Sequence, residues 1–216
     1  ERAVANGVKT LVVQPTHLMH GAEYDEMCEA LDAYKDKIEN IVIAEPLLGE
    51  VGDDATVINA DKEAVAKAVV AAAEADGSFE SMAKAAEEGT ALVLMGHGTA
   101  HVAKVTYSQM QTQMNELGYK NVFIGTVEGE PEETSCESVI EAVKAAGYTK
   151  VVLRPLMVVA GDHANNDMAG ADEDSWKSMM EAAGLATECQ IAGLGRIDAV
   201  QDLYVAHTQA AMDTLK

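Results

Sequence analysis

ALVLMGHGTAH, residues 91–101, is a run of five apolar residues that ends in a glycine turn holding a histidine. An uninterrupted apolar run bounded by glycine is typical of a strand buried on both faces of a parallel sheet. The glycines permit a sharp turn and keep side-chain bulk away from His97. Because open α/β sheets bind ligands at the carboxyl ends of their strands, the segment indicates a site at His97, although a capped strand end with an incidental histidine would look the same.

Strand-like and helical patterns alternate on both sides of this segment. Further strands are expected at residues 10–14, 40–48, 121–127, 150–160 and 188–194. Helices are expected at residues 1–9 (the end of one), 23–40, 61–76, 77–88, 103–117, 135–146, 174–183 and 197–215. This alternation and spacing predict an α/β fold, with doubly wound parallel sheets covered by helices on both faces.

The chain contains an internal repeat. VVQPTHLMHG (12–21) aligns without gaps on VLRPLMVVAG (152–161), and IAEPLLG (43–49) resembles IAGLG (191–195). The repeat predicts two similar units, although two buried strands can also resemble each other by chance. We expect an N-terminal α/β domain over 1–88, a C-terminal α/β domain over 89–196, and a final helix over 197–216 that packs back on the first domain.

The first of these domains is expected to be incomplete at its N-terminus. In the second unit, the strands near residues 91 and 121 precede the strand that contains Arg154 and Pro155. Their counterparts in the first unit would lie before residue 1, so the sequence is expected to lack roughly fifty residues of a two-unit protein.

The amino-acid composition argues against several classes of partner and function. The chain has 216 residues, of which 36 are acidic and 15 basic, and its net charge of −21 argues against nucleic acid and anionic membrane surfaces as partners. Three cysteines, far apart in sequence, form no disulfide framework, and no apolar run reaches membrane-spanning length. A cytoplasmic protein is expected, and a periplasmic form stays open because the chain starts at Glu1 without a methionine.

Three polar side chains follow predicted strands of the second unit: His97 in GHGT, Glu128 in GTVEG and His163 in GDHANND. Adjacent parallel strands present such loops to one crevice. Two imidazoles and a carboxylate suit a borderline divalent metal such as Co²⁺, Fe²⁺, Ni²⁺ or Zn²⁺, and three protein ligands leave open coordination positions. The sequence has no GxxxxGK[ST] phosphate loop, so ATP-driven chemistry is unsupported.

Other residues are weaker candidates for contact with a ligand. His17 and His20 lie in the loop of the first unit, which should face the same cleft, although loop histidines are usually just solvated. His101 stands four residues after His97 at a predicted helix start. Arg154 and Arg196 could pair with a ligand carboxylate or could equally anchor acidic residues of this chain.

Several segments together resemble the anaerobic-pathway sirohydrochlorin cobaltochelatases, a class II chelatase family related in fold to ferrochelatase. The segments that carry the resemblance are QPTHLMHGAEYD (14–25), GHGTAHVA (96–103), GTVEG (125–129), RPLMVVAGDHANNDMAG (154–170) and DEDSWK (172–177). The likeness runs through essentially the whole chain. The family's opening strand, with its SFGT-like loop, has no counterpart here, which agrees with the repeat.

The resemblance implies two similar α/β domains with a cleft between them, a homo-oligomer, and metal insertion without ATP or an organic cofactor. It implies a tetrapyrrole substrate, sirohydrochlorin or precorrin-2, with Co²⁺ as the substrate metal in cobalamin synthesis. By motif, His97 and His163 become metal-binding and proton-accepting residues, and Glu128 the carboxylate beside them. An Fe²⁺ or Ni²⁺ chelatase, a non-catalytic metal or tetrapyrrole carrier and, more weakly, a metal-dependent hydrolase remain as alternatives.

Overall fold

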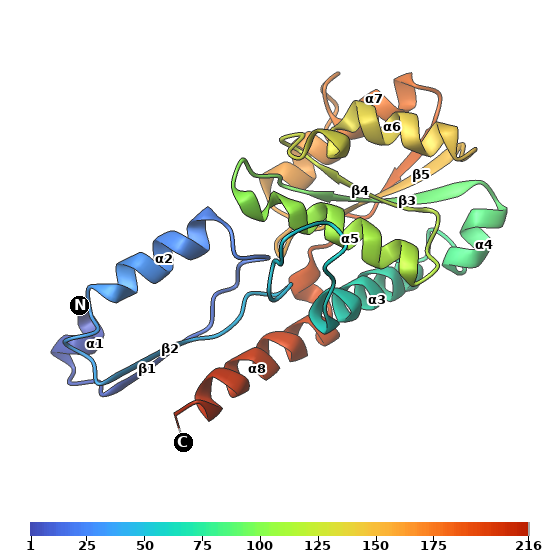
Figure 1. Cartoon of the computed structure of the whole chain (residues 1–216). Helices are drawn as coiled ribbons and strands as arrows, with labels where there is room; N and C mark the ends of the chain where they lie inside the picture. The colour runs from blue at the N-terminus through green and yellow to red at the C-terminus, as the bar shows by residue number, and fades with distance from the viewer. Residues whose placement is uncertain (216) are drawn as a thin grey trace.

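A four-stranded parallel sheet forms the centre of the larger of two lobes (Figure 1). The structure is a computed structural model and describes residues 1–215. The strand order is β4-β3-β5-β6, and every neighbouring pair is parallel. The strands are β3 (Thr90–Gly96), β4 (Val122–Thr126), β5 (Lys150–Pro155) and β6 (Ala186–Cys189). The predicted α/β fold with parallel sheets is confirmed.

Strand β3 is buried on both faces, as the apolar run predicts. All seven of its residues are buried, and alternate side chains enter two separate hydrophobic cores. Leu92 and Leu94 face the core built with the helices on one side, and Val93 and Met95 face the other. The first side carries α3 (Ala60–Ala75), α4 (Met82–Glu87) and α5 (Val105–Glu116), and the second carries α6 (Cys136–Ala145) and α7 (Trp176–Ala182) (Figure 1).

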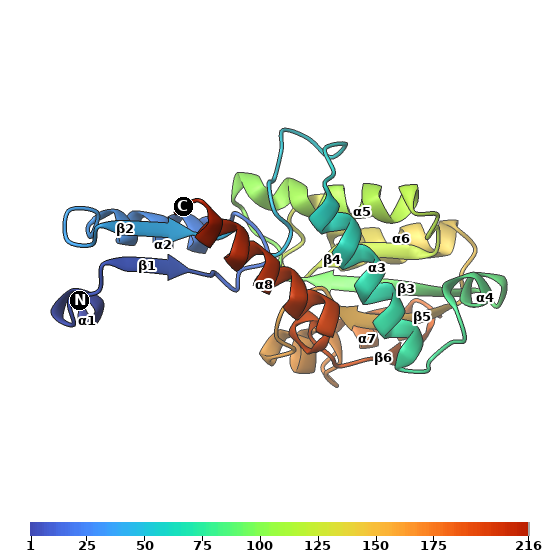
Figure 2. The ribbon, with the colours of Figure 1, turned by 90° about the horizontal axis from the view of Figure 1, so that it is seen from below.

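The smaller lobe contains a parallel pair of strands, β1 (Thr10–Val13) and β2 (Asn40–Ile43). It also holds α1 (Arg2–Ala5) and α2 (Ala22–Asp32). The last helix, α8 (Asp198–Asp213), packs against β1, β2 and α3 and so joins the lobes (Figure 2). Its Tyr204 hydroxyl lies 3.2 Å from the carbonyl oxygens of both Thr16 and His17. The helix thereby anchors the loop that follows β1.

The repeated segments occupy matching places in the two sheets. The pair β1–β2 and the pair β5–β6 are each parallel neighbours, but β5 has β3 on its other edge, whereas β1 has no second strand partner among residues 1–215. Helices α3 and α4, which precede residue 88, cover the four-stranded sheet and share its core. The domain boundary at residue 88 therefore stays a prediction, and the larger lobe includes helices from before it.

Several element boundaries differ from those expected: the strands that begin at Asn40 and Lys150 and the helix before β3 are shorter than predicted, and α2 and β6 also differ. Helix α2 ends at Asp32 because the chain must reverse before β2, and the N–H groups of Lys37 and Ile38 both donate to the carbonyl of Tyr34 in that turn. Strand β6 covers 186–189, earlier than the predicted 188–194. After β6, backbone hydrogen bonds connect the chain to the loop that follows β5 instead of continuing the strand.

Short helical turns complete the larger lobe. They are η1 (Val102–Lys104), η2 (Glu132–Thr134), the π-helical η3 (Ala164–Met168) and η4 (Leu194–Arg196). Within residues 1–215, none of the helices combines the length and the apolar character needed to cross a membrane.

Candidate functional site

The strand order explains why the predicted site residues meet. Strand β3 lies between β4 and β5, so the loops after these three strands share one edge of the sheet. His97 directly follows β3, and the ladder between β3 and β4 continues past the strands: the N–H of Val127 donates to the carbonyl of Gly96 at 3.0 Å, and the N–H of Glu128 to that of His97 at 2.9 Å. The backbone of Glu128 is thereby fixed beside His97.

The turn after β3 requires its glycines. Gly98 has a φ of +93°, and a Cβ there would lie 2.9 Å from the Cβ of Glu128. A Cβ at Gly96 would collide with the ring of Tyr107. The Tyr107 hydroxyl in turn accepts a hydrogen bond from the N–H of Gly98 at 3.0 Å, and burial raises the pKa of this phenol. The protonated, buried Tyr107 therefore stabilises the turn that holds His97, through its hydrogen bond to Gly98 and its ring contact with Gly96.

Tyr107→Phe should lower the free energy of unfolding by about 1–3 kcal/mol, because it leaves the buried N–H of Gly98 without an acceptor. Urea unfolding followed by circular dichroism measures this loss. The matched control is Tyr148→Phe, since the Tyr148 ring packs on Phe123 and its hydroxyl has no hydrogen-bond partner among residues 1–215. Equal stability of the two variants would show that the Tyr107 hydroxyl does not support the turn.

His97 and His163 lie in direct contact. Their ring centroids are 4.6 Å apart, and the rings meet edge to face at 82°. The Nδ1 of His97 lies 2.8 Å from the carbonyl oxygen of Gly98, and the Nδ1 of His163 lies 2.6 Å from Oδ2 of Asp167. Both oxygens are acceptors, so each Nδ1 carries the proton and each Nε2 of the neutral ring keeps its lone pair. Two imidazoles are thus in the tautomer that binds a metal through Nε2.

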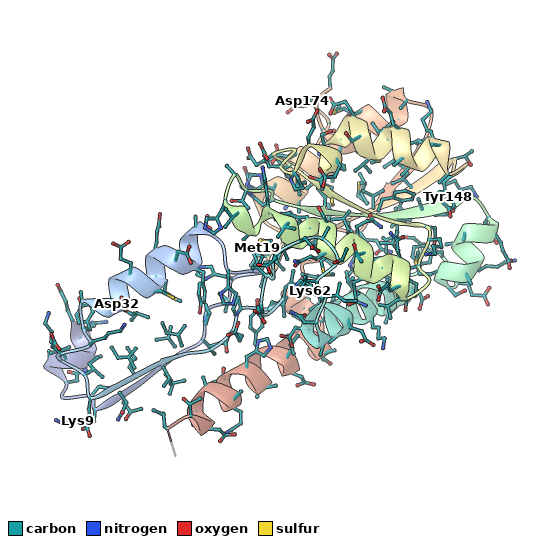
Figure 3. The ribbon with its side chains drawn as sticks, viewed as in Figure 1. Lys9, Met19, Asp32, Lys62, Tyr148 and Asp174 are labelled. Carbon is teal, nitrogen blue, oxygen red and sulfur yellow. The ribbon has the colours of Figure 1, made fainter. Side chains whose placement is uncertain are left out.

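A cavity of about 540 Å³ opens between the lobes beside this pair. The smaller lobe supplies residues from the loop after β1 and the start of α2, and the larger lobe supplies residues from α5 and from the loops after β3, β4 and β5. The wall consists of His17, Leu18, Met19, Gly21, Glu23, His97, Gly98, Thr99, Ala100, Tyr107, Glu128, Met157 and Val158. Met19 marks the junction of the lobes in Figure 3. His163 adjoins the wall through its contact with His97.

The expected three-ligand metal set stays a prediction. No group of three or more His, Cys, Asp or Glu side chains in the described part of the chain, residues 1–215, is arranged to hold a metal ion. The structure does bring His97 and His163 together, and it places Glu128 in the same cavity wall as His97. The Glu128 side chain is exposed and makes no hydrogen bond within residues 1–215, so no partner opposes its rotation.

The three other candidate histidines have different surroundings. His17 lies in the cavity wall, and its Nδ1 is buried without a hydrogen-bond partner in the described residues. His20 pairs with Glu45, Nε2 to Oε2 at 2.6 Å. The Nδ1 of His101 accepts the N–H of Ala103, and its Nε2 lies 3.2 Å from Asp25 on α2, a contact between the lobes. Of the three, only His17 belongs to the wall, and contact of His20 or His101 with a substrate stays a prediction.

Arg154 does not face the cavity, which corrects the expectation that it contacts a ligand there. Its side chain is only 2% exposed, and its guanidinium donates to the carboxylate of Asp76 and, at 2.7 Å, to Oε1 of Gln190. Asp76 is the C-cap of α3 and Gln190 directly follows β6. Arg154 therefore connects α3, which covers the sheet, with β5 and the end of β6.

Sequence reasoning missed three residues near the site. Asp167 stands four residues after His163, and that spacing could have suggested a pair on one helical turn. Glu23 aligns with His163 in the repeat, and it lies in the cavity wall. No local sequence pattern identifies Tyr107 as part of the site, because its role depends on how α5 packs against the turn after β3.

Comparison with known proteins finds cobalt chelatases, both among family models and among individual sequences. A family model described as cobalt chelatase (CbiK) matches residues 1–213. A sirohydrochlorin cobaltochelatase of Salmonella typhimurium is 29% identical over 213 residues, which cover 99% of this chain and 72% of that protein. The sirohydrochlorin cobaltochelatase CbiKC of Nitratidesulfovibrio vulgaris is 30% identical over 207 residues, which cover 95% of this chain and 66% of that protein.

Two solved structures share the fold. SirB from Bacillus subtilis with Fe³⁺ superposes with a TM-score of 0.60 at 16% identity, over 97% of this chain and 74% of that one. The sirohydrochlorin chelatase SirB from Bacillus subtilis subspecies spizizenii in complex with cobalt gives 0.54 at 17% identity, over 96% and 71%. At these identities the likeness bears on the architecture alone, a chelatase-like arrangement of parallel sheets.

Proposed function

Because this chain belongs to the cobalt chelatase (CbiK) family, we propose that it inserts Co²⁺ into sirohydrochlorin. The observation that carries the proposal is the contact between His97 and His163 beside the cavity between the lobes, with the Nδ1 of each ring committed to an oxygen acceptor so that Nε2 is the nitrogen left to bind a metal. Imidazole nitrogen is a suitable ligand for Co²⁺, and a cavity of about 540 Å³ lies within the usual range for small-molecule sites.

In the proposed reaction, Co²⁺ is a substrate that the two imidazoles, with Glu128, present to one face of the macrocycle. Two pyrrole N–H protons leave as the metal enters, and bonds from the metal to the ring nitrogens replace its bonds to imidazole. The two protons pass to groups that can accept them near neutral pH, namely the histidines as they are freed from the metal and Glu128. The exchange needs no phosphoryl transfer, so we include independence from ATP and from an organic cofactor in the proposal.

Charge works against substrate binding. The chain carries a net charge of −21, Glu23 and Glu128 both lie in the cavity wall, and sirohydrochlorin bears several carboxylates. Lys104 follows His101 by three residues, on η1. Its ammonium group forms an ion pair with Glu130, with Nζ 2.7 Å from Oε2. Neutral hydrogen-bond donors of the wall must therefore supply much of the recognition, and His17 is a side chain of this kind.

His17→Asn should raise the KM for sirohydrochlorin by about tenfold, whereas His17→Gln should change it little. The buried, unpartnered Nδ1 of His17 tolerates a lone pair better than an N–H, so the proton belongs on the accessible Nε2. Glutamine can place an N–H near the position of Nε2, and asparagine near that of Nδ1. Steady-state kinetics at saturating Co²⁺ measure the effect, and the opposite order of the two variants would contradict a donor at Nε2.

An anaerobic insertion assay tests the proposed function. The protein is mixed with sirohydrochlorin and Co²⁺, and the absorption spectrum is followed with and without ATP. We expect a rate well above that of the protein-free control, unchanged by ATP. A rate equal to the control, together with binding of both metal and macrocycle, would indicate a carrier. Parallel runs with Fe²⁺, Ni²⁺ and precorrin-2 would show whether the preferred metal or macrocycle differs from the one proposed.

A further inference from the structure

Asp167 lies on an unusual turn directly after the proposed ligand His163. Residues 164–168 form a π-helical turn, a rare feature that is frequently found at functional sites. Ala164 and Met168 are fully buried in the core of the larger lobe and hold this turn against the sheet. Gly170 closes it by donating its N–H to the carbonyl of Asn166 at 2.9 Å, and a Cβ at Gly170 would collide with that carbonyl.

The turn places a carboxylate on the back of the His163 ring. Oδ2 of Asp167 lies 2.6 Å from Nδ1, so the acceptor of this hydrogen bond is a carboxylate. His97 makes the equivalent contact with the neutral carbonyl of Gly98, at 2.8 Å. The other nearby carboxylate on this loop, Asp162, is engaged by the side-chain amide of Asn166 at 2.7 Å. The two imidazoles of the pair are thus held by different kinds of acceptor.

We propose that Asp167 is a positioning residue for Co²⁺ transfer: it fixes the proton of His163 on Nδ1 and makes the His163 Nε2 the stronger donor of the two imidazoles. A carboxylate behind a ligating histidine orients the ring and raises its basicity, whereas a backbone carbonyl adds no charge. The inference rests on the proposed function, because it takes His163 as a ligand of the incoming metal. It predicts an unequal pair, in which His163 binds first and His97 completes the transfer.

The proposal is tested first by the affinity for Co²⁺ alone, measured by titration calorimetry on the metal-free wild-type protein and its variants. Asp167→Ala should weaken binding by about 10- to 100-fold, and Asp167→Asn should weaken it less because the amide oxygen can still accept the Nδ1 proton. Asp174→Asn is the matched control: it removes the same charge from an exposed position after the π-helical turn, and its affinity should stay at the wild-type value (Figure 3).

A second readout separates positioning from general damage to the fold. In ¹⁵N NMR spectra of the metal-free protein, the His163 ring, assigned through His163→Gln, should show a protonated Nδ1 and an unprotonated Nε2. Asp167→Ala should mix the two tautomers, while Asp167→Asn should keep the wild-type one. If Asp167→Ala fails to fold by circular dichroism, the Co²⁺ affinity of Asp167→Asn, compared with that of Asp174→Asn, decides the question: a loss in Asp167→Asn alone supports the proposal, and equal affinities overturn it.

The outcomes distinguish this inference from the proposed function. If His163→Gln weakens Co²⁺ binding but removing the Asp167 carboxylate leaves both affinity and tautomer unchanged, the inference fails and the proposed function stands. If His163→Gln binds Co²⁺ as tightly as the wild type, His163 is not a ligand, and both the assignment of the metal site and the inference fail.

Discussion

His97→Ala should reduce the rate of Co²⁺ insertion into sirohydrochlorin by about 10²- to 10⁴-fold, the range expected when a group that binds the metal and accepts a proton is removed. His97 is placed for both roles, because its side chain lines the cavity and its Nδ1 is committed to the carbonyl of Gly98, which leaves Nε2 as the nitrogen with a lone pair. The alanine side chain also removes the ring contact with His163. The measurement is the initial rate of the change in absorption under anaerobic conditions.

The matched control for this prediction is His101→Asn on the same loop. Asparagine keeps an acceptor for the N–H of Ala103 and loses only the contact of Nε2 with Asp25. Since His101 lies outside the cavity wall formed by the described residues, any contact it makes with the substrate should affect KM, and we expect the insertion rate at saturating sirohydrochlorin to stay close to that of the wild type. Similar losses in His97→Ala and His101→Asn would mean that the loop as a whole matters and that His97 has no particular role.

The sequence was sufficient to predict the part of the site that depends on strand ends. The apolar run before Gly96 defines β3, and the strand alternation places the loops with His97, Glu128 and His163 at one edge of a parallel sheet. The contact between His97 and His163 follows from β3 and β5 being neighbours. These features are local in sequence or follow from topology, which is why a sequence pattern can reveal them.

Features that depend on packing between distant segments were not predictable in the same way. The amphipathic pattern of α3 shows that one face is buried but does not say against which sheet, and in the structure that face belongs to the core of the four-stranded sheet. The partners of Arg154 are 78 and 36 residues away in sequence, and a basic residue beside a proline at a strand end equally suggested a ligand contact. The support of the His97 turn by Tyr107 depends on the packing of α5 in the same way.

Asp76→Ala should lower the free energy of unfolding by about 3 kcal/mol, because it leaves the buried guanidinium of Arg154 without its charged partner. Removing one member of a buried ion pair costs about 3–5 kcal/mol, and the lower end applies here because Asp76 is itself 47% exposed. Gln190 stays as a neutral acceptor for Arg154, but it cannot balance the charge. Urea unfolding followed by circular dichroism measures the loss.

Replacing the arginine should cost less than removing its partner. Arg154→Met fills the buried position with an apolar side chain and removes the Arg154 Nε, which is buried and has no hydrogen-bond partner among residues 1–215. The carboxylate of Asp76 is exposed enough to be hydrated when it is alone, and Gln190 keeps its bonds to Ala73 and Ser78. We therefore expect Arg154→Met to be clearly more stable than Asp76→Ala and to keep the wild-type KM for sirohydrochlorin. A raised KM in a fully folded Arg154→Met variant would show that Arg154 contacts the substrate. If Arg154→Met were instead less stable than Asp76→Ala, the packing of the arginine side chain would contribute more to stability than its ion pair with Asp76.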